Sequence, residues 1–335
     1  MSLISVLKKK NNKTLFTTPS HGGKFCLFHK FYQWYRADIS EIEALAPDEA
    51  LEKAEQEAAK IYGVKYTKFL TNGSSSGIIA SVLALRPKKL LIWDMAHPCH
   101  KNAAKLSGAE VIEYSLPIDE ELGIHRAITP QKVEELLLQF NVDAIILTSP
   151  TYEGFVANVK EISEICKAYN AKLIVDEAHG ALYPFSEDLP ESAVKFADFT
   201  IQSLHKTAGG INPTALLHSN SLDPTEALRL ITTTSPSYPM LATIEANIKF
   251  LNSKRGKKHI DMLIQNIKNL GLKQLNDDPT KILLIGGEQL SETLFYKYGI
   301  EDEKTNQKTT MLLCGIGTDK KKLGRLGKVL RHLGF

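Results

Sequence analysis

Between residues 67 and 218, short hydrophobic runs alternate with segments in which hydrophobic side chains recur every three or four positions. The runs are apolar on both faces, which is typical of strands in a parallel sheet that helices cover. They lie at Thr67–Leu70, Leu90–Trp93, Val111–Tyr114, Ala144–Thr148, Lys172–Val175, Phe199–Gln202 and Ala215–His218. Helices are expected between them, as at Ser74–Leu85, Pro130–Phe140 and Val159–Tyr169. The pattern predicts an α/β fold with a mostly parallel seven-stranded sheet.

The pattern changes after about residue 240, where a smaller α+β unit is expected. Its elements are one long helix at Ile244–Asn266, a strand at Lys281–Ile285, a helix at Gln289–Tyr298 and a strand at Met311–Cys314. We therefore divide the chain into an N-terminal arm (residues 1–46), a large domain (47–243) and a small domain (244–335). The arm is expected to pack on the small domain or on a second subunit.

Composition and charge narrow the class of protein. The chain has 335 residues, of which 43% are hydrophobic and 24% charged, as in a folded globular protein with a large core. A net charge of +3 indicates no nucleic-acid partner, because such binding needs a localised basic face. The basic run Lys320–His332 carries leucines at helical spacing, so its charges are expected on the solvated side of an amphipathic helix.

Cysteine usage and the N-terminus point to the cytoplasm. The four cysteines contain no Cys-x-x-Cys pair, so neither a disulfide framework nor a zinc site is indicated. A short apolar stretch followed by lysines opens the chain, which is the reverse of a secretory signal. No segment approaches the length that crosses a bilayer, so no membrane is expected.

Candidate chemistry lies where the expected strands end. In "FLTNGSSSG", Gly73, Ser74 and Ser75 come between a strand and a helix, where free N–H groups and the helix dipole favour an anion. A serine there also commonly serves only as a helix cap. In "KLIVDEAHGAL", Asp176 ends a buried strand and is either solvated or paired with a cation, and His179 follows it.

Two further strand ends carry reactive side chains. His97 and His100 follow a third strand; without a third ligand at suitable spacing, stacking or hydrogen bonding is favoured over a metal site. In "FTIQSLHKTAGG", a strand leads to Ser203, His205 and Lys206 and then to two glycines, which we expect to let the backbone pass close to a ligand. One ligand matches an anion site, an aromatic partner, a carboxylate and a lysine amine together. That ligand is pyridoxal 5'-phosphate.

These stretches resemble the Orn/Lys/Arg decarboxylase family of fold-type I pyridoxal-phosphate enzymes. The similarity is carried mainly by residues 36 to 250, in the family's order, and more weakly by "YGIEDE" and "GIGTD" in the small domain. The matching stretches are "RADISEIEAL", "AEQEAAKIYG", "TNGSSSG", "CHKN", "TSPTYEG", "VDEAHGAL", "QSLHKTAGG" and "TTSPSYPMLATIE". The resemblance implies the aspartate-aminotransferase-like fold, pyridoxal phosphate as cofactor, and a homodimer with shared active sites.

The resemblance also implies a role for individual residues. Lys206 aligns with the lysine that joins the cofactor aldehyde, and His205 with a residue that contacts the phosphate or donates a proton. Asp176 would pair with the ring nitrogen, and His100 would stack on the ring. Gly73, Ser74, Ser75 and Ser203 would bind the phosphate. His179 would lie near the ring oxygen or the substrate carboxylate, and Thr151 near the ring oxygen. Ser235 and Ser237 would reach across a dimer interface.

The implied function is decarboxylation of lysine, ornithine or arginine to an amine or polyamine precursor. Transamination or a lyase reaction on another amino acid is the alternative, and a non-catalytic binding protein a third. Aminotransferases usually hold the α-carboxylate with a small-domain arginine, and here only Arg255, Arg325 and Arg331 follow residue 240, all in surface-like contexts. A basic substrate would need a buried acid. Four candidates remain open, namely Asp38, Glu41, Glu153 and Glu303.

Overall fold

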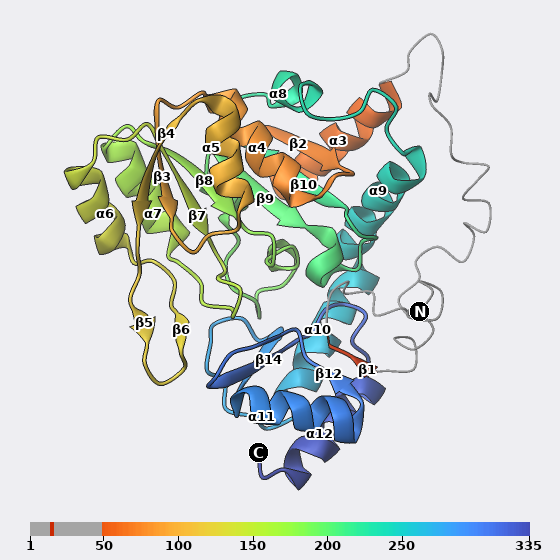
Figure 1. Cartoon of the computed structure of the whole chain (residues 1–335). Helices are drawn as coiled ribbons and strands as arrows, with labels where there is room; N and C mark the ends of the chain where they lie inside the picture. The colour runs from red at the N-terminus through yellow and green to blue at the C-terminus, as the bar shows by residue number, and fades with distance from the viewer. Residues whose placement is uncertain (1–13, 17–48) are drawn as a thin grey trace, which may run out of the picture.

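The computed structural model describes residues 14–16 and 49–335 of the chain, and Figure 1 shows their arrangement. Most of the expected N-terminal arm, together with Asp38 and Glu41, lies outside the described residues. A large sheet with flanking helices occupies one part of the molecule and a smaller unit the other (Figure 1). A cavity lined by residues of both parts lies where they meet.

All seven expected strands are present, each within one residue of the predicted bounds. They are β2 (Tyr66–Leu70), β3 (Lys89–Trp93), β4 (Glu110–Tyr114), β7 (Ala144–Thr148), β8 (Lys172–Asp176), β9 (Phe199–Ser203) and β10 (Ala215–Ser219). Their order in the sheet is β2-β10-β9-β8-β7-β3-β4. β10 runs antiparallel to both of its neighbours, β2 and β9, and the other strand pairs of this sheet are parallel. The predicted mostly parallel α/β sheet is confirmed.

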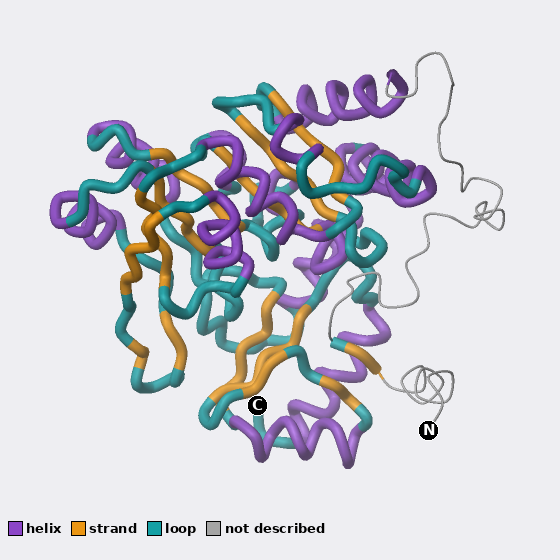
Figure 2. The backbone as a smooth tube through the Cα atoms, turned by 45° about the horizontal axis from the view of Figure 1, so that its top comes forward, coloured by secondary structure: helices purple, strands orange, loops and turns teal. Residues whose placement is uncertain are grey.

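Helices cover both faces of the sheet, as Figures 1 and 2 show. On one face Leu90 and Ile92 pack with α4 (Gly73–Leu85) and α5 (Cys99–Ser107), and on the other Leu91 packs with α6 (Pro130–Gln139) and α7 (Val159–Ala168). This alternation within β3 follows from side chains that point to opposite faces at successive positions. The helices of this part also include α3 (Glu49–Tyr62) and α8 (Thr225–Arg229), with 3-10 turns η1 (Tyr183–Phe185) and η2 (Ala193–Lys195).

The smaller unit contains a three-stranded antiparallel sheet, in the order β11-β14-β13, with helices around it. Its strands are β11 (Lys281–Ile285), β12 (Ile300–Glu301), β13 (Lys304–Thr305) and β14 (Thr309–Leu313). Its helices are α10 (Lys254–Lys268), α11 (Gly287–Glu292), the π-helix η4 (Thr293–Lys297) and α12 (Lys320–His332), while α9 (Tyr238–Asn252) leads into it. The predicted division at residues 243 and 244 falls inside α9 and stays a prediction.

The single long helix expected at residues 244–266 is wrong, because the chain forms two helices that break at Ser253. The Ser253 hydroxyl accepts a hydrogen bond from the Gly256 N–H at 3.0 Å, which caps α10. A Cβ at Gly256 would lie 2.0 Å from the Phe250 carbonyl oxygen, so the close turn needs a glycine there. Hydrophobic spacing continues through the break, which is why periodicity alone did not reveal it.

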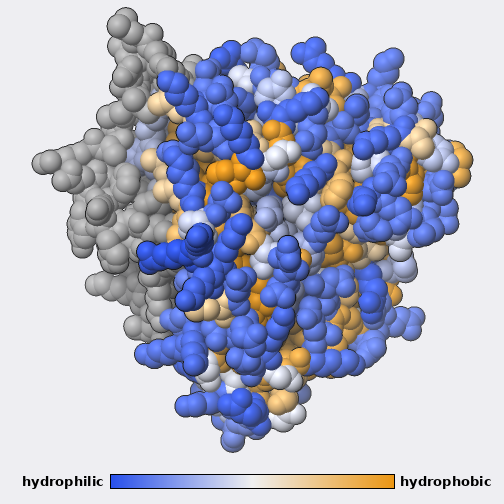
Figure 3. All heavy atoms as spheres, turned by 180° about the vertical axis from the view of Figure 1, so that it is seen from behind, coloured by the Kyte–Doolittle hydropathy of each residue, from blue (hydrophilic) through white to orange (hydrophobic). Residues whose placement is uncertain are grey.

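The amphipathic helix expected near the C-terminus is α12, in which Leu323, Leu326 and Leu330 are buried. In the smaller unit, β12 pairs parallel with β1 (Thr14–Leu15). Phe16 is almost fully buried in the hydrophobic cluster that also contains the leucines of α12. Seen from behind, the surface is largely hydrophilic, with hydrophobic residues between the charged ones (Figure 3). Among the described helices, none combines the length and apolar character needed to span a membrane.

A chain of buried polar side chains ties four neighbouring strands together. Thr67 contacts His218 at 3.0 Å, and His218 contacts the side-chain oxygen of Gln202 at 3.3 Å. Gln202 then donates to Glu177 at 2.6 Å, directly after Asp176 at the end of β8. Burial raises the pKa of Glu177 to about 7 even though Ser192 and the Ala193 N–H also donate to it. This chain fixes the ends of β8 and β9, from which the site residues project.

We predict that Glu177 makes folding stability fall as the pH rises from about 4.5 to about 7. In that window the carboxyl ionises in the unfolded chain but stays protonated in the folded one, so its contribution is complete below the window and lost above it. Urea unfolding of the wild type and Glu177→Gln at several pH values measures the difference. The wild type should lose about 3 kcal/mol relative to the variant across the window. Parallel curves would contradict the assignment.

Candidate active site

A cavity of about 800 Å³ lies at the carboxyl ends of the parallel strands. Such ends are where ligands bind in open α/β sheets. Three further parts complete its wall: the hairpin β5 (Ile118–Asp119) to β6 (Ile124–His125), the loop after β7, and the strand β13 of the smaller unit. Its lining includes Asn72, Gly73, Ser74, Ser75, Trp93, His97, Cys99, His125, Tyr152, Glu153, Asp176, Ala178, His179, His205, Lys206, Asn212, Pro213, Lys304 and Asn306.

The start of α4 presents the predicted anion site to this cavity. Gly73, Ser74 and Ser75 all line it, and Gly73 adopts a positive φ of 76° at the turn from β2 into the helix. The Asn72 side chain makes no capping hydrogen bond, and the first turn contains no acidic residue. The first N–H groups of a helix have no partner within it, so this end suits a phosphate.

Asp176 lies at the end of β8 with its carboxylate in the cavity wall. Its Oδ2 is 2.9 Å from His100 Nε2, and its Oδ1 accepts from the Ala178 N–H at 3.1 Å. Burial alone would raise the pKa of Asp176, but the hydrogen bond with His100 and the nearby charge of Lys206 lower it below the ordinary value. Asp176 is therefore held as an anion in a buried position.

His100 is fully buried and packs behind Asp176, whereas His97 lines the cavity. The stacking role that the resemblance gives His100 stays a prediction. Cys99, His100 and Asp176 place potential metal ligands within 4.8 Å of one another, in a group that does not include His97. His100 Nδ1 is buried without a hydrogen-bond partner among the residues described.

Lys206 projects into the cavity from the π-helix η3 (Leu204–Ala208), which follows β9. Its Nζ lies 3.1 Å from His179 Nε2. Burial lowers the pKa of Lys206, and the positive charge of Lys281 lowers it further, against the opposing effect of Asp176. Burial and the charge of Lys206 also lower the pKa of His179 well below its ordinary value. A neutral imidazole therefore faces a lysine whose amine loses its proton more readily than usual.

The remaining predicted residues lie at different depths. His205 lines the cavity, and its Nδ1 lies 3.2 Å from the Thr214 carbonyl oxygen. Ser203 is fully buried outside the lining, and its hydroxyl has no partner within the described part of the chain. Thr151 lies behind the wall, where its hydroxyl accepts from the Phe155 N–H at 3.1 Å. Ser235 and Ser237 are in the segment that leads into α9 and do not line the cavity.

The reason predicted for the two glycines after Lys206 is wrong. Neither glycine lines the cavity. A Cβ at Gly210 would lie 2.5 Å from the Thr214 hydroxyl and 2.6 Å from the Leu204 Cβ, while Gly209 has a positive φ of 86°. The two glycines therefore let η3 close tightly on the chain's own next strand. The sequence could not distinguish this contact from contact with a ligand.

At the rim of the cavity, Tyr152 and Lys304, to which the sequence motifs gave no role, contact Glu303 and Glu153, two of the four candidate acids. Tyr152 packs edge-on against His179, with ring centres 4.7 Å apart, and its hydroxyl donates to Glu303 at 2.7 Å. Lys304 pairs with Glu153 at 2.6 Å. Tyr152 lies inside the matching stretch "TSPTYEG", which was the available signal for it. Lys304 follows a charged stretch and gave no such signal.

The hairpin β5 to β6 closes a further side of the cavity. Trp93 and His125 both line it and pack edge to face, with ring centres 5.4 Å apart. The Asn306 side chain donates to the Gly123 carbonyl oxygen at 3.2 Å, and the Lys308 ammonium contacts the Glu120 carbonyl oxygen. The turn between β13 and β14 therefore holds the hairpin in place.

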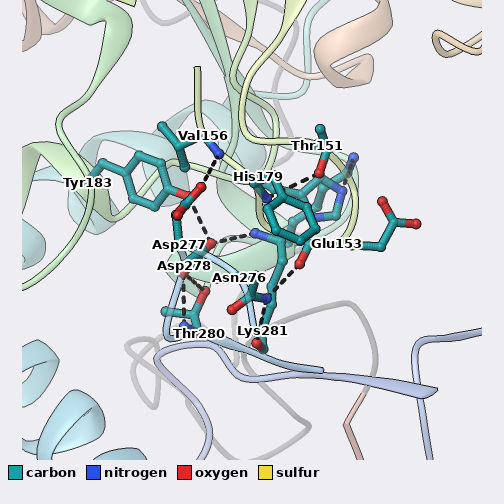
Figure 4. A network of polar contacts seen from close by, with 12 residues as sticks. Thr151, Glu153, Val156, His179, Tyr183, Asn276, Asp277, Asp278, Thr280 and Lys281 are labelled. Carbon is teal, nitrogen blue, oxygen red and sulfur yellow. Dashed lines mark hydrogen bonds and ion pairs between the residues drawn. The ribbon is translucent and has the colours of Figure 1, made fainter. Parts of the chain in front are cut away.

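A buried network joins the loop after β7 to the loop before β11 (Figure 4). Lys281 and Asp278 form an ion pair at 2.5 Å with both side chains fully buried. Tyr183 and Thr280 also donate to Asp278, at 2.8 and 2.6 Å. The N–H groups of Asp277 and Asp278 both donate to the Gly154 carbonyl oxygen at 3.0 Å. The network therefore fixes the loop that carries Tyr152 and Glu153 to the cavity.

Comparison with solved structures identifies the fold class. The structure of the constitutive lysine decarboxylase of Escherichia coli matches with a TM-score of 0.75 and 22% identity, over 92% of this chain and 55% of that chain. Serine palmitoyltransferase of Sphingomonas wittichii matches with a TM-score of 0.71 and 16% identity, over 96% and 87% of the two chains. A serine palmitoyltransferase solved with PLP has a TM-score of 0.69. The fold is that of the fold-type I pyridoxal-phosphate enzymes.

Sequence comparison then gives the family. The model of the Orn/Lys/Arg decarboxylase major domain matches residues 5–304, so the chain belongs to this family, as the resemblance implied. Arginine decarboxylase of Bacillus anthracis is 29% identical over 321 residues, which is 86% of this chain. The constitutive lysine decarboxylase of Escherichia coli is 28% identical over 293 residues, or 76% of this chain. The chain spans 65% and 41% of the lengths of these two relatives.

We predict that Lys281→Met lowers the free energy of unfolding by about 3 to 5 kcal/mol, because it leaves the Asp278 carboxylate buried without its cation. Urea unfolding at neutral pH measures the loss. Lys132→Met is the matched control, since Lys132 pairs with Glu135 at 3.1 Å on an exposed helix face, where a pair contributes about 1 kcal/mol or less. Equal effects of the two substitutions would refute a structural role for the buried pair.

Proposed function

We propose that the protein is a pyridoxal-phosphate-dependent decarboxylase that acts on a basic amino acid (lysine, ornithine or arginine) and releases carbon dioxide and an amine or polyamine precursor. One observation carries this proposal. Lys206, the buried anion Asp176 and the open start of α4 face a single cavity of about 800 Å³. Membership of the Orn/Lys/Arg decarboxylase family supports the reaction class.

The residues present fit this cofactor. A phosphate matches the N–H groups and hydroxyls at Gly73, Ser74 and Ser75, and a protonated ring nitrogen matches Asp176. His179 Nδ1 is buried without a partner in the described residues, as is the Ser203 hydroxyl, and both lie beside this region. His100 holds Asp176 from behind and thereby orients its carboxylate. When bound, pyridoxal phosphate accepts the electrons of the bond that breaks at the substrate's α-carbon.

The chain's own groups prepare the site for that chemistry. The lowered pKa of Lys206 leaves more of its amine neutral and nucleophilic near neutral pH. His179 Nε2 lies 3.1 Å from Lys206 Nζ and so holds the amine at this wall of the cavity. His205, held at the Thr214 carbonyl oxygen, is placed to give or take a proton at the same wall. Asp176 stays ionised and supplies a fixed negative charge.

The positions of the arginines favour decarboxylation over transamination. Within the described residues, no arginine lines it. Arg255 lies in the first turn of α10, and Arg325 and Arg331 lie on α12, where Arg325 contacts the Tyr298 carbonyl oxygen. A bidentate clamp on the α-carboxylate is therefore not supplied from these positions. A carboxylate that must leave needs no such clamp. The homodimer with Ser235 and Ser237 at its interface, and the cytoplasmic location, stay part of this proposal.

We predict that protein purified with pyridoxal phosphate keeps the cofactor at Lys206. Borohydride reduction followed by peptide mapping should place the cofactor mass on the peptide that contains Lys206. In Lys206→Ala the mass should be absent, and carbon dioxide release should fall by at least about a thousandfold because the nucleophile is removed. Lys101→Ala, which removes an exposed lysine from α5, is the control and should behave like the wild type.

A substrate panel identifies the reaction. Lysine, ornithine and arginine are offered separately, and carbon dioxide, amine and keto acid are measured. Amine in equal amount to carbon dioxide from at least one of the three supports the proposal. Keto acid without amine would identify an aminotransferase instead, and cofactor mass on a lysine other than Lys206 would refute the assignment of the site.

A further inference from the structure

The rim of the cavity contains a cation site that one of the protein's own lysines fills. The Lys304 ammonium lies 2.6 Å from the Glu153 carboxylate and 4.8 Å from the centre of the Tyr152 ring. A carboxylate combined with an aromatic face is an arrangement that binds ammonium groups. The Tyr152 hydroxyl donates to Glu303, which fixes the ring in the orientation that presents its face.

This cation site is connected to the reactive lysine by direct contacts. Lys206 Nζ is 3.1 Å from His179 Nε2, and the His179 ring centre is 4.7 Å from that of Tyr152. Lys206, Glu153 and Lys304 line the same cavity. A substrate whose α-amine meets Lys206 can extend its side chain past His179 and Tyr152 to Glu153 within this one cavity.

The Glu153 and Lys304 side chains differ in how far they are exposed to solvent. The Glu153 side chain is 9% exposed, whereas the Lys304 side chain is 47% exposed. The backbone of Lys304 is held in β13, where it pairs with Met311 of β14, so only its side chain needs to move. A half-exposed ammonium is readily hydrated when it leaves, but a mostly buried carboxylate left without a cation is costly. Glu153 therefore needs a cation, and Lys304 is replaceable.

We propose that Glu153 and the Tyr152 ring form the subsite for the terminal ammonium or guanidinium of the substrate, and that Lys304 occupies this subsite as a built-in competitor until the substrate displaces it. The inference rests on the proposed function for its choice of a basic amino acid. Displacement lowers the apparent affinity by the fraction of molecules in which Lys304 has left the subsite. Lys304 thereby reduces the discrimination against side chains without a positive end, because these leave the Glu153–Lys304 pair intact, whereas without Lys304 they would leave Glu153 without a cation.

The test uses two amines that differ only in the second charge. Holoenzyme is titrated calorimetrically with 1,5-diaminopentane and with pentylamine, and the ratio of the two dissociation constants measures recognition of the distal ammonium. In the wild type we expect the diamine to bind about tenfold more tightly. In Glu153→Gln the ratio should fall close to one. In Lys304→Met it should rise by about threefold or more, since the competitor is removed.

Matched variants separate this subsite from general effects of charge. Lys132→Met and Glu135→Gln alter the exposed pair on α6 and should leave the ratio unchanged. Tyr152→Phe keeps the aromatic face and should retain most of the selectivity, whereas Tyr152→Leu should lose it. The KM for the basic amino acid that reacts best should be higher in Glu153→Gln and Tyr152→Leu and lower in Lys304→Met. The kcat should change less than the KM.

A lower ratio in Lys304→Met would overturn the proposal, because Lys304 would then help to bind the substrate rather than compete with it. An unchanged ratio in Glu153→Gln would overturn it equally. The amine titration does not depend on turnover. If the variants follow the expected order but no basic amino acid is decarboxylated, the proposed reaction fails and the subsite stands. If a basic amino acid is decarboxylated but the titrations show no difference between the variants, the subsite fails and the reaction stands.

Discussion

Two opposite charges that have no contact with water hold the active-site loop in place. Lys281 and Asp278 belong to the smaller unit, yet the N–H groups of Asp277 and Asp278 bind the carbonyl oxygen of Gly154, in the loop after β7. Gly154 has a positive φ of 95°, and a Cβ there would lie 2.9 Å from Asn276 and 3.0 Å from Lys281. A side chain at this position would push the two parts of the molecule apart. The position of Tyr152 and Glu153 therefore depends on a buried pair outside the cavity.

The same pair influences the reactive lysine through its charge. Lys281 lowers the pKa of Lys206, in addition to the larger effect of burial, while Asp176 opposes both. A neutral amine and an ionised Asp176 are both needed within one cavity, although a carboxylate normally favours a protonated lysine. His100 satisfies part of the Asp176 charge at 2.9 Å. The cavity thus keeps its anion on one wall and a readily deprotonated lysine on another.

The sequence predicted the parts of this structure that follow from local pattern. All seven strands of the large sheet could be located, because most of them, such as β7, β8 and β9, are short runs buried on both faces. The residues at their ends could be assigned to one cavity, because parallel strands present the same ends to one edge. The break at Ser253 was missed because hydrophobic spacing passes through it. Gly210 was misread because its neighbours, Thr214 and Leu204, become close only in the folded chain.

The residues on the far side of the cavity could not be predicted from the sequence. Lys304 lies 98 positions after Lys206 and pairs with Glu153, a separation of 151 residues in the chain. No periodicity or motif spans such a distance, and an ion pair at a rim needs no distinctive residue types. The wall made of strand ends carries the residues proposed to bind the cofactor. The far wall is made of the loop after β7, the turn of the β5 to β6 hairpin and β13. Substrate choice is therefore expected to depend on contacts such as Glu153 with Lys304, which only the folded arrangement brings together.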